Sequence, residues 1–348
     1  MSDAIPRHLQ VNPAARKRGN GRKGVRRIQR IEHAEKAWST PLQALLVAER
    51  AAVLTGNQTE FVMLLTIAYT GMRWSEALAI APGAVRKEEL DIHWKLYELG
   101  GRFYRGYPKD GSKRTVDIPP FLRQLLANYL GQGRKLRCPC VEREGDDRDD
   151  IPWCHGDEYV FLGARGGHHQ RSHFSERIMR PAADGWYTGR SNRPRMPVLV
   201  DLNQPYPGAI LPPWPANDPA APPHVPQRRR GLRQPPADAA LASWLPVLNG
   251  LTPHGLRHGH KTWMDEAKIH RSLSTDRMGH EVPGMDGIYG HITPGMRREL
   301  LSVLEDLWTT ALQQRAAISR SSAVPMLDAL LKNSAAPNSL PETEKPDL

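Results

Sequence analysis

The sequence has few cysteines and lacks any long apolar run. Its 348 residues include three cysteines, too few for a disulfide framework, so we expect reduced thiols and a cytoplasmic protein. No stretch approaches the ~20 apolar residues of a transmembrane helix, and the first residues lack the apolar centre of a signal peptide. These absences argue against a membrane protein and a secreted one, and we expect no membrane partner.

Acidic residues are scarce where basic residues are densest. The chain carries 48 Lys and Arg against 37 Asp and Glu, a net charge of +11. Residues 1–30 alone hold nine Lys or Arg and a single acid, Asp3. This balance indicates a polyanionic partner, although charge alone does not identify it. We expect residues 1–38 to form a basic arm that is disordered when free and contacts phosphate groups when bound.

Helices are predicted at the start of the remaining chain. Thr40 precedes a proline and an apolar series of helical period, which is typical of a helix start. Residues 60–69 predict a second helix, apolar nearly all round and therefore buried. Gly71 tolerates a left-handed backbone, so we expect it to end that helix and to place Arg73 at the start of the next one. Glu76 lies one turn after Arg73 and could orient it or a nearby histidine, so we interpret it as a supporting residue.

After residue 90 the apolar period changes to two. Residues 90–96 alternate apolar and polar side chains, which predicts a strand with one buried face. A glycine pair then turns the chain into a second strand, and residues 115–118 predict a third. The turn before the third strand carries Lys109, with Lys113 and Arg114 close enough to be rivals for its role. The fold class we predict is mainly α with a small antiparallel β-sheet, an α+β fold.

One stretch concentrates groups that can bind a phosphate. A Pro-His-Gly start predicts a helix on which His254 and Arg257 lie one turn apart and can hold one anion together. His280 follows a glycine that ends a further helical stretch. Tyr289 comes nine residues later, after the glycine-rich turn 283–287, where a tyrosine can be exposed and mobile.

This stretch resembles the active-site end of the tyrosine recombinases, the phage integrase family. It joins a His-x-x-Arg pair, a Gly-His and a tyrosine in the family's order and at its usual spacings. Residues 70–78, TGMRWSEAL, are similar to the family's first arginine box, and residues 108–114, PKDGSKR, to its hairpin lysine. The resemblance covers about residues 40–314, interrupted by a long insertion. It implies six catalytic residues: Arg73, Lys109, His254, Arg257, His280 and Tyr289.

The resemblance implies site-specific DNA recombination, the integration or excision of a mobile element, through a 3′-phosphotyrosyl intermediate. Arg73 and Arg257 would bind the phosphate with forked donors that stay charged. The two histidines would donate hydrogen bonds and move protons. Lys109 would protonate the departing 5′ oxygen, and Tyr289 would be the nucleophile. No cofactor or metal ion is required for this chemistry.

The partners implied are double-stranded DNA at attachment-type sites, copies of the chain that form a tetramer on DNA, and a directionality factor. The implied location is the nucleoid in the cytoplasm. Recombinases of this family usually carry a separate helical core-binding domain, and here about forty mostly basic residues precede the catalytic pattern. One alternative is therefore an N-terminally shortened remnant that binds DNA without cutting it. A type IB topoisomerase, which shares the residue set, is another.

The insertion spans residues 138–250. Four groups near its start could supply three thiolates and an imidazole to a tetrahedral zinc ion: Cys138, Cys140, Cys154 and His155. The Cys-x-Cys spacing differs from the commoner Cys-x-x-Cys, so we expect reduced cysteines without a metal. The run 166–174, GGHHQRSHF, leads into a helix, and its polar start suits either a phosphate contact or an ordinary cap.

Composition sets the expected domain boundaries. Residues 186–246 hold fourteen of the 31 prolines and no sustained period, which predicts an extended surface loop. Residues 294–314 predict an amphipathic helix that either caps its own domain or docks on a neighbouring subunit. We therefore expect the catalytic domain over residues 39–318. A polar tail, with a short helix over residues 326–331, is expected over residues 319–348.

Overall fold

The computed structural model describes residues 36–109, 112–133, 136–140, 154, 156–189, 195–201, 210–211, 241–280 and 291–334. The predicted arm up to residue 35, the tail beyond residue 334, His155 and Tyr289 lie outside the described residues. Residues 1–35 form one unit and residues 36–348 another, and the described residues all belong to the second.

Helices form about half of the described structure, and the helix start predicted at Thr40 and the helix end predicted at Gly71 are confirmed. The helices are α1 (Pro41–Thr55), α2 (Gln58–Thr70), α3 (Trp74–Ala77), η1 (Pro82–Ala84), α4 (Pro120–Leu130), α5 (Arg171–Phe174), the π-helical η3 (Ser175–Met179), α6 (Arg180–Asp184), α7 (Pro253–Glu266), α8 (Arg271–Met278), α10 (Pro294–Ile318) and α11 (Pro325–Ser334). Thr40 caps α1 by accepting a hydrogen bond from the backbone N–H of Gln43, and the Gln43 side chain accepts one from Thr40 in return. Gly71 ends α2 with a left-handed φ of 68°.

Four strands form two small antiparallel sheets. The strands are β1 (Glu89–Ile92) paired with β4 (Arg114–Asp117), and β2 (Lys95–Leu99) paired with β3 (Arg102–Gly106). The predicted α+β class is thereby confirmed. The single strand predicted over residues 90–96 is wrong, because β1 and β2 pair with different partners. Asp91 also breaks the predicted alternation. It is buried, and its carboxylate accepts from Thr115 at 2.7 Å and pairs with Arg86 at 2.5 Å.

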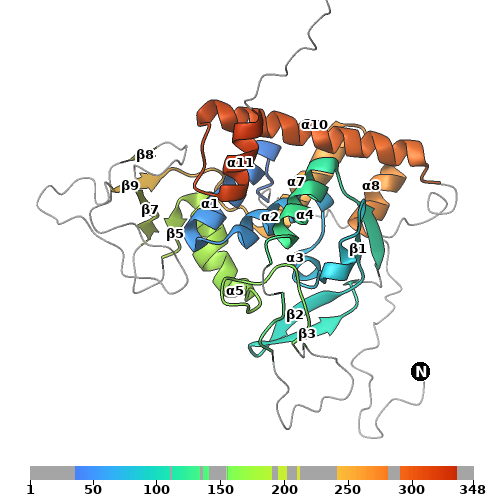
Figure 1. Ribbon diagram of the computed structural model, residues 1–348, viewed down its shortest axis with the longest axis horizontal. Coiled ribbons are helices and arrows are strands. Elements are labelled where there is room, and N and C mark those ends of the chain that lie inside the picture. The colour runs from blue at the N-terminus through green and yellow to red at the C-terminus, as the bar shows by residue number, and fades with distance from the viewer. Residues whose placement is uncertain are drawn as a thin grey trace, which may run out of the picture. The chain divides into compact units, whose positions relative to one another are not determined.

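The core is built around α2, in which every residue from Thr59 to Thr70 is buried, as its apolar pattern predicted. At its end, Tyr69 packs edge-on against Phe121 of α4 at 4.7 Å between ring centroids. Phe121 in turn stacks on Trp308 of α10 at 4.2 Å. The predicted amphipathic helix therefore covers its own domain. Figure 1 shows α10 along one edge of the unit, on the opposite side from the β2–β3 hairpin.

A buried ion pair holds the C-terminal end of α10 against α1. Arg315 pairs with Glu49 at 2.6 Å, and both side chains are fully buried. Ser322 adds a hydroxyl donor to the same carboxylate at 2.6 Å. Because a charge removed from water needs a partner, this cluster fixes where α10 ends and where the chain turns into α11.

The Pro-rich segment contains strands where an extended loop was predicted, so that prediction is wrong in its described parts. The strands are β5 (Trp186–Tyr187) paired with β6 (Met196–Pro197), and β9 (Leu241–Trp244) flanked by β7 (Leu199–Asp201) and β8 (Ile210–Leu211). Trp244 is buried, and the guanidinium of Arg50 lies 4.7 Å above its ring. Arg50 also donates to the carbonyl of Leu245 at 2.7 Å. These contacts with α1 offset the weak strand pattern, which sequence periodicity could not reveal.

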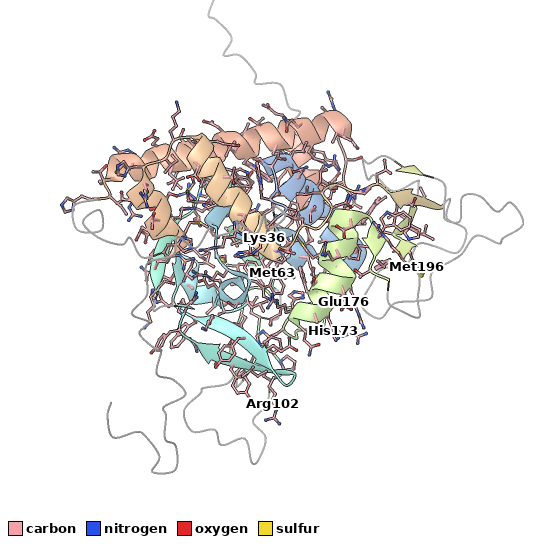
Figure 2. The ribbon with its side chains drawn as sticks, turned by 180° about the vertical axis from the view of Figure 1, so that it is seen from behind. Lys36, Met63, Arg102, His173, Glu176 and Met196 are labelled. Atoms are coloured by element: carbon pink, nitrogen blue, oxygen red, sulfur yellow. The ribbon has the colours of Figure 1, made fainter. Side chains whose placement is uncertain are left out.

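The turn between β2 and β3 lies at the surface. Figure 2 shows Arg102 at the tip of the β2–β3 hairpin, away from the buried Met63. No helix in the described part of the chain is long and apolar enough to span a membrane.

Candidate active site

Arg73 and Arg114 bind one buried carboxylate, that of Glu76. Arg73 is the N-cap residue of α3; its Nη1 and its backbone N–H each donate to Glu76 at 2.8 Å. Arg114 begins β4 and donates from Nη1 and Nη2 at 3.3 and 2.8 Å. The Glu76 side chain is 1% exposed, whereas that of Arg73 is 22% exposed. Glu76 thus orients Arg73 and leaves part of its guanidinium open to a ligand, the supporting role that its spacing suggested.

The carboxyl group of Glu76 stays ionised despite its burial. Burial alone would raise its pKa, but the hydrogen bonds and charge of Arg114, with those of Arg73, lower the pKa to about 2. A charged acceptor between two guanidinium groups holds both in fixed geometry.

Arg257 joins α7 to the last residue of α8, Met278, and to His280. It is 3% exposed and donates to the carbonyls of Gly71 and, at 2.5 Å, of Met278. Its Nη2 also lies 2.9 Å from Nε2 of His280. A guanidinium has no acceptor, so Nε2 of His280 accepts this bond and the ring proton belongs on Nδ1. Burial and then the charge of Arg257 lower the pKa of His280, which favours the neutral ring.

Two glycines allow the helix ends to approach this cluster. Gly279 ends α8 with a φ of 60°, and a Cβ placed there would lie 2.8 Å from Nη1 of Arg114. Gly71 ends α2, and a Cβ there would lie 2.7 Å from the ring of His260. Both positions therefore need glycine for its backbone conformation and for its lack of a side chain.

A second buried arginine fixes α8 in place. Arg277 donates from Nε to His260 at 2.9 Å and from its two other nitrogens to the carbonyls of Asp117 and Tyr69, at 2.8 and 2.9 Å. Burial holds the pKa of His260 well below 6.5, so its ring is neutral and can accept the bond from Arg277. These bonds tie α8 to α2, α7 and β4, and so position the His280 backbone.

His254 lies at the rim of a cavity of about 940 Å³ that Arg73 also lines. His254 is the second residue of α7 and follows Pro253. The N-cap residue of this helix, Thr252, accepts a hydrogen bond from the backbone N–H of Gly255 through its hydroxyl. Its ring packs edge-on against His258, with centroids 4.4 Å apart. Partial burial of the ring and the nearby charges, among them Arg257 and Arg73, lower the pKa of His254 to about 4. A neutral His254 can donate a hydrogen bond at pH 7.

Lys109 is exposed on the turn between β3 and β4, and the structure links that turn to Arg73. The Lys109 carbonyl accepts from the backbone N–H of Ser112 at 3.2 Å, and the Ser112 hydroxyl accepts from Nη1 of Arg73 at 3.4 Å. The rival Lys113 instead lies 3.9 Å above the ring of Tyr107. The other rival, Arg114, is buried on Glu76. Lys109 and Lys113 are both exposed, so burial removes only Arg114 from the three.

Positive charge exceeds negative charge within this cluster. Among the described residues that interact electrostatically with Arg257, Arg73 and Arg114 are cations and Glu76 is the carboxylate. The cluster thus holds three guanidinium groups and one carboxylate, which pairs with Arg73 and Arg114. Burial and then the charge of Arg73 lower the pKa of Arg257 to about 9. Such a site gains free energy when it binds an anion, because the anion supplies the missing counter-charge.

The structure brings together four of the six predicted residues: Arg73, His254, Arg257 and His280. Lys109 is linked to Arg73 only through Ser112, which bonds the Lys109 carbonyl with its backbone N–H and Arg73 with its hydroxyl. Tyr289 lies outside the described residues. Sequence reasoning missed the roles of Arg114 and Arg277. Arg114 stood out in the sequence only as a rival of Lys109, and Arg277 only as a basic residue beside apolar helix positions, which does not distinguish it from a surface residue.

Neither a family model nor a curated protein matches this sequence. Similar solved structures include the Tn1549 transposon integrase in complex with transposon right end DNA, at 15% identity, covering 79% of this chain and 68% of that chain, with a TM-score of 0.44. The same integrase in complex with circular intermediate DNA gives 15% identity, 78% and 68% coverage and a TM-score of 0.43. XerA recombinase gives 14% identity, 78% and 64% coverage and a TM-score of 0.37. At these values the likeness assigns no residue role, which must come from the site's own geometry.

Proposed function

We propose that this chain is a tyrosine-type site-specific DNA recombinase that cleaves and rejoins DNA strands for a mobile element. The observation that carries the proposal is the convergence of Arg73 and Arg257, from distant parts of the chain, in one cluster with more cations than carboxylates. A phosphodiester is the anion that such forked donors fit, and both oxygens of the phosphate can be bound at once. The net charge of +11 favours the same polyanion.

In the proposed reaction, the Tyr289 hydroxyl gives its proton to a neutral histidine ring as its oxygen attacks the scissile phosphorus, and the bond from phosphorus to the 5′ oxygen breaks. Lys109 donates a proton to that departing oxygen, and the 3′ end becomes joined to the tyrosine. Arg73 and Arg257 stabilise the charge that grows on the phosphate oxygens. A 5′ hydroxyl from a partner strand then reverses the step and releases the tyrosine. The phosphotyrosyl bond keeps the free energy of the broken linkage, so the cycle needs no nucleotide cofactor.

The histidines act as neutral donors and proton carriers in this proposal. His280 accepts from Arg257 through Nε2, so its Nδ1–H is left to face the substrate. His254, neutral at pH 7, donates to a phosphate oxygen from the cavity rim.

Because exchange of two duplexes uses four active sites, we propose a tetramer on attachment-type DNA, with a directionality factor as an accessory partner. The cytoplasm, at the nucleoid, is the proposed location.

Covalent trapping tests this function. The protein is incubated with a nicked suicide substrate built from the ends of the DNA element that encodes it, and protein–DNA adducts are separated on a denaturing gel. We expect an adduct with the wild-type chain and none with Tyr289→Phe. DNA binding without any adduct would instead support a remnant that binds but does not cut. Relaxation of supercoiled plasmid of any sequence would support a type IB topoisomerase.

A further inference from the structure

Three cysteines and a histidine converge away from the proposed active-site cluster. The Sγ atoms of Cys138 and Cys154 are 3.1 Å apart, and the Sγ of Cys154 is 3.3 Å from Nε2 of His168. Together with Cys140, these residues offer four ligand atoms that all lie within 4.8 Å of one another. His155, the histidine nearest in sequence to Cys154, lies outside the described residues, and His168 supplies the imidazole.

The spacing of these atoms is that of ligands around one ion. With Zn–S bonds of about 2.3 Å and Zn–N bonds of about 2.0 Å, tetrahedral geometry separates ligand atoms by roughly 3.5–3.8 Å. The separations of 3.1 and 3.3 Å lie just below this range, and the widest pair, within 4.8 Å, must close by roughly 1 Å around an ion. A disulfide requires sulfur atoms about 2.05 Å apart, and three cysteines would leave one unpaired. Three sulfurs and one imidazole nitrogen form a ligand set that zinc commonly takes.

The surroundings hold the ligands in place. Cys154 is fully buried and Cys138 is 4% exposed. The backbone N–H of Cys138 donates to the backbone carbonyl of Asp157 at 3.1 Å, and that of Cys154 donates to the backbone carbonyl of Phe103 at 2.9 Å. The ring of His168 packs against Phe103 and edge-on against Tyr159, each at 4.7 Å between centroids. Four protein ligands leave no position for a water molecule, which is the arrangement of a structural site.

Gly156 supports the same arrangement. Its φ is 87°, and a Cβ there would lie 3.0 Å from the carbonyl of Cys140. The carbonyl of Gly156 accepts from Nε of Arg137 at 2.7 Å. The segments before and after residues 141–153 are therefore locked together beside the ligands.

We propose that these three cysteines and His168 bind one structural zinc ion. The ion joins Cys138 and Cys140, the segment around Cys154, and the loop before α5 that carries His168, all within the insertion. Phe103 packs on His168 and also lines the large cavity, as does the neighbouring His169. Zinc therefore braces one wall of that cavity. This proposal revises our expectation of unligated cysteines, and it stands independently of the proposed DNA chemistry.

Elemental analysis and thiol counting on the full-length protein test the site. The protein is expressed in medium supplemented with zinc, desalted, and analysed for bound metal, and free thiols are counted after denaturation with a chelator. We expect one zinc ion per chain and three free thiols. Absence of stoichiometric zinc would overturn the proposal, as would a thiol count showing that two cysteines are joined in a disulfide.

Matched variants test the choice of histidine. We expect His168→Gln to lose stoichiometric zinc and His155→Gln to retain it; the opposite result would overturn the assignment of His168.

Replacement of zinc by Co²⁺ in the wild-type protein gives a readout that does not depend on variants folding. Thiolate-to-Co²⁺ charge-transfer bands and the strong visible absorption of a tetrahedral ion are expected. A weak octahedral spectrum without charge-transfer bands would contradict the ligand set.

Discussion

Nη2 of Arg257 lies 2.9 Å from Nε2 of His280, so the most buried candidate arginine and an exposed histidine form one unit. Because Arg257 can only donate, it fixes His280 as a neutral ring with its proton on Nδ1. This one contact sets both the orientation of the His280 ring and its protonation state.

The first prediction follows from that contact. His280→Gln keeps an acceptor for Arg257 but removes the ring that carries a proton. We expect DNA affinity to change little and the rate of adduct formation to fall about 100-fold, the typical contribution of a positioned acid or base. Single-turnover cleavage of the suicide substrate and an equilibrium binding assay give the two quantities.

The control for this prediction is His93→Gln, an exposed histidine between β1 and β2, which should leave both quantities unchanged. Equal loss of binding and cleavage in His280→Gln would show that the ring only supports the fold.

A second prediction concerns stability and the buried carboxylate. Glu76 has a pKa of about 2 in the folded protein against an ordinary 4.5. A depressed pKa contributes stability above the unfolded value, and that contribution is lost as the pH falls toward the folded value. The shift corresponds to about 3 kcal/mol at neutral pH. Glu76→Gln should therefore lower the free energy of unfolding by that order at pH 7 and by much less near pH 2.5, measured by urea denaturation.

Glu88→Gln is the matched control, because Glu88 is 70% exposed in its pair with Arg123. It should change stability by less than about 0.5 kcal/mol. A loss in Glu76→Gln that is the same at both pH values would contradict the electrostatic account.

A third prediction separates backbone strain from crowding at Gly279. Gly279 and Gly100 have similar φ values, 60° and 57°, so alanine costs about 1–2 kcal/mol of strain at either position. A Cβ at Gly279 meets Arg114 at 2.8 Å, whereas at Gly100 no described atom lies within 4 Å. Gly279→Ala should therefore be the less stable variant and should also weaken DNA binding, because it displaces Arg114 from Glu76. Urea denaturation and a DNA-binding titration would show this, and equal effects of the two variants would refute it.

A fourth prediction links DNA affinity to pH through His254. The pKa of this ring is about 4 in the free protein. A bound phosphate adds negative charge beside the ring and raises that pKa, so the complex holds more protons than the free protein between about pH 4 and 6.5. Affinity should therefore increase as the pH falls through this window, by at most about tenfold per pH unit for one proton. His254→Gln should reduce the slope and His93→Gln should keep it. A slope that His254→Gln leaves unchanged would rule out this residue as the source.

Local features of the fold were predictable from sequence because their causes are local. Thr40 caps α1, and Gly71 and Gly279 end their helices, through hydrogen bonds and backbone angles within a few residues. The one-turn spacing of Arg73 and Glu76 likewise predicted their contact. Strand boundaries were harder. The split after Ile92 depends on which strand each half pairs with, and periodicity holds no information about partners.

The long-range parts of the site could not be read from the sequence. Arg114 reaches the carbonyl of Arg277 and the carboxylate of Glu76, contacts that exist only once β4, α8 and α3 have packed. His168 joins the cysteines from fourteen residues beyond Cys154, and the sequence alone does not favour it over His155, which is adjacent to Cys154. In both cases the sequence shows the residue type but not the residue that it contacts.

The most direct test of the central claim is the identity of the residue that carries DNA in the covalent adduct. The trapped complex is digested with nuclease and protease, and the peptide that retains a nucleotide is sequenced by mass spectrometry. The account predicts a phosphotyrosyl linkage at Tyr289, lost in Arg257→Ala although the variant still binds DNA. A linkage at another residue, or an adduct that persists in Arg257→Ala at the wild-type rate, would contradict it.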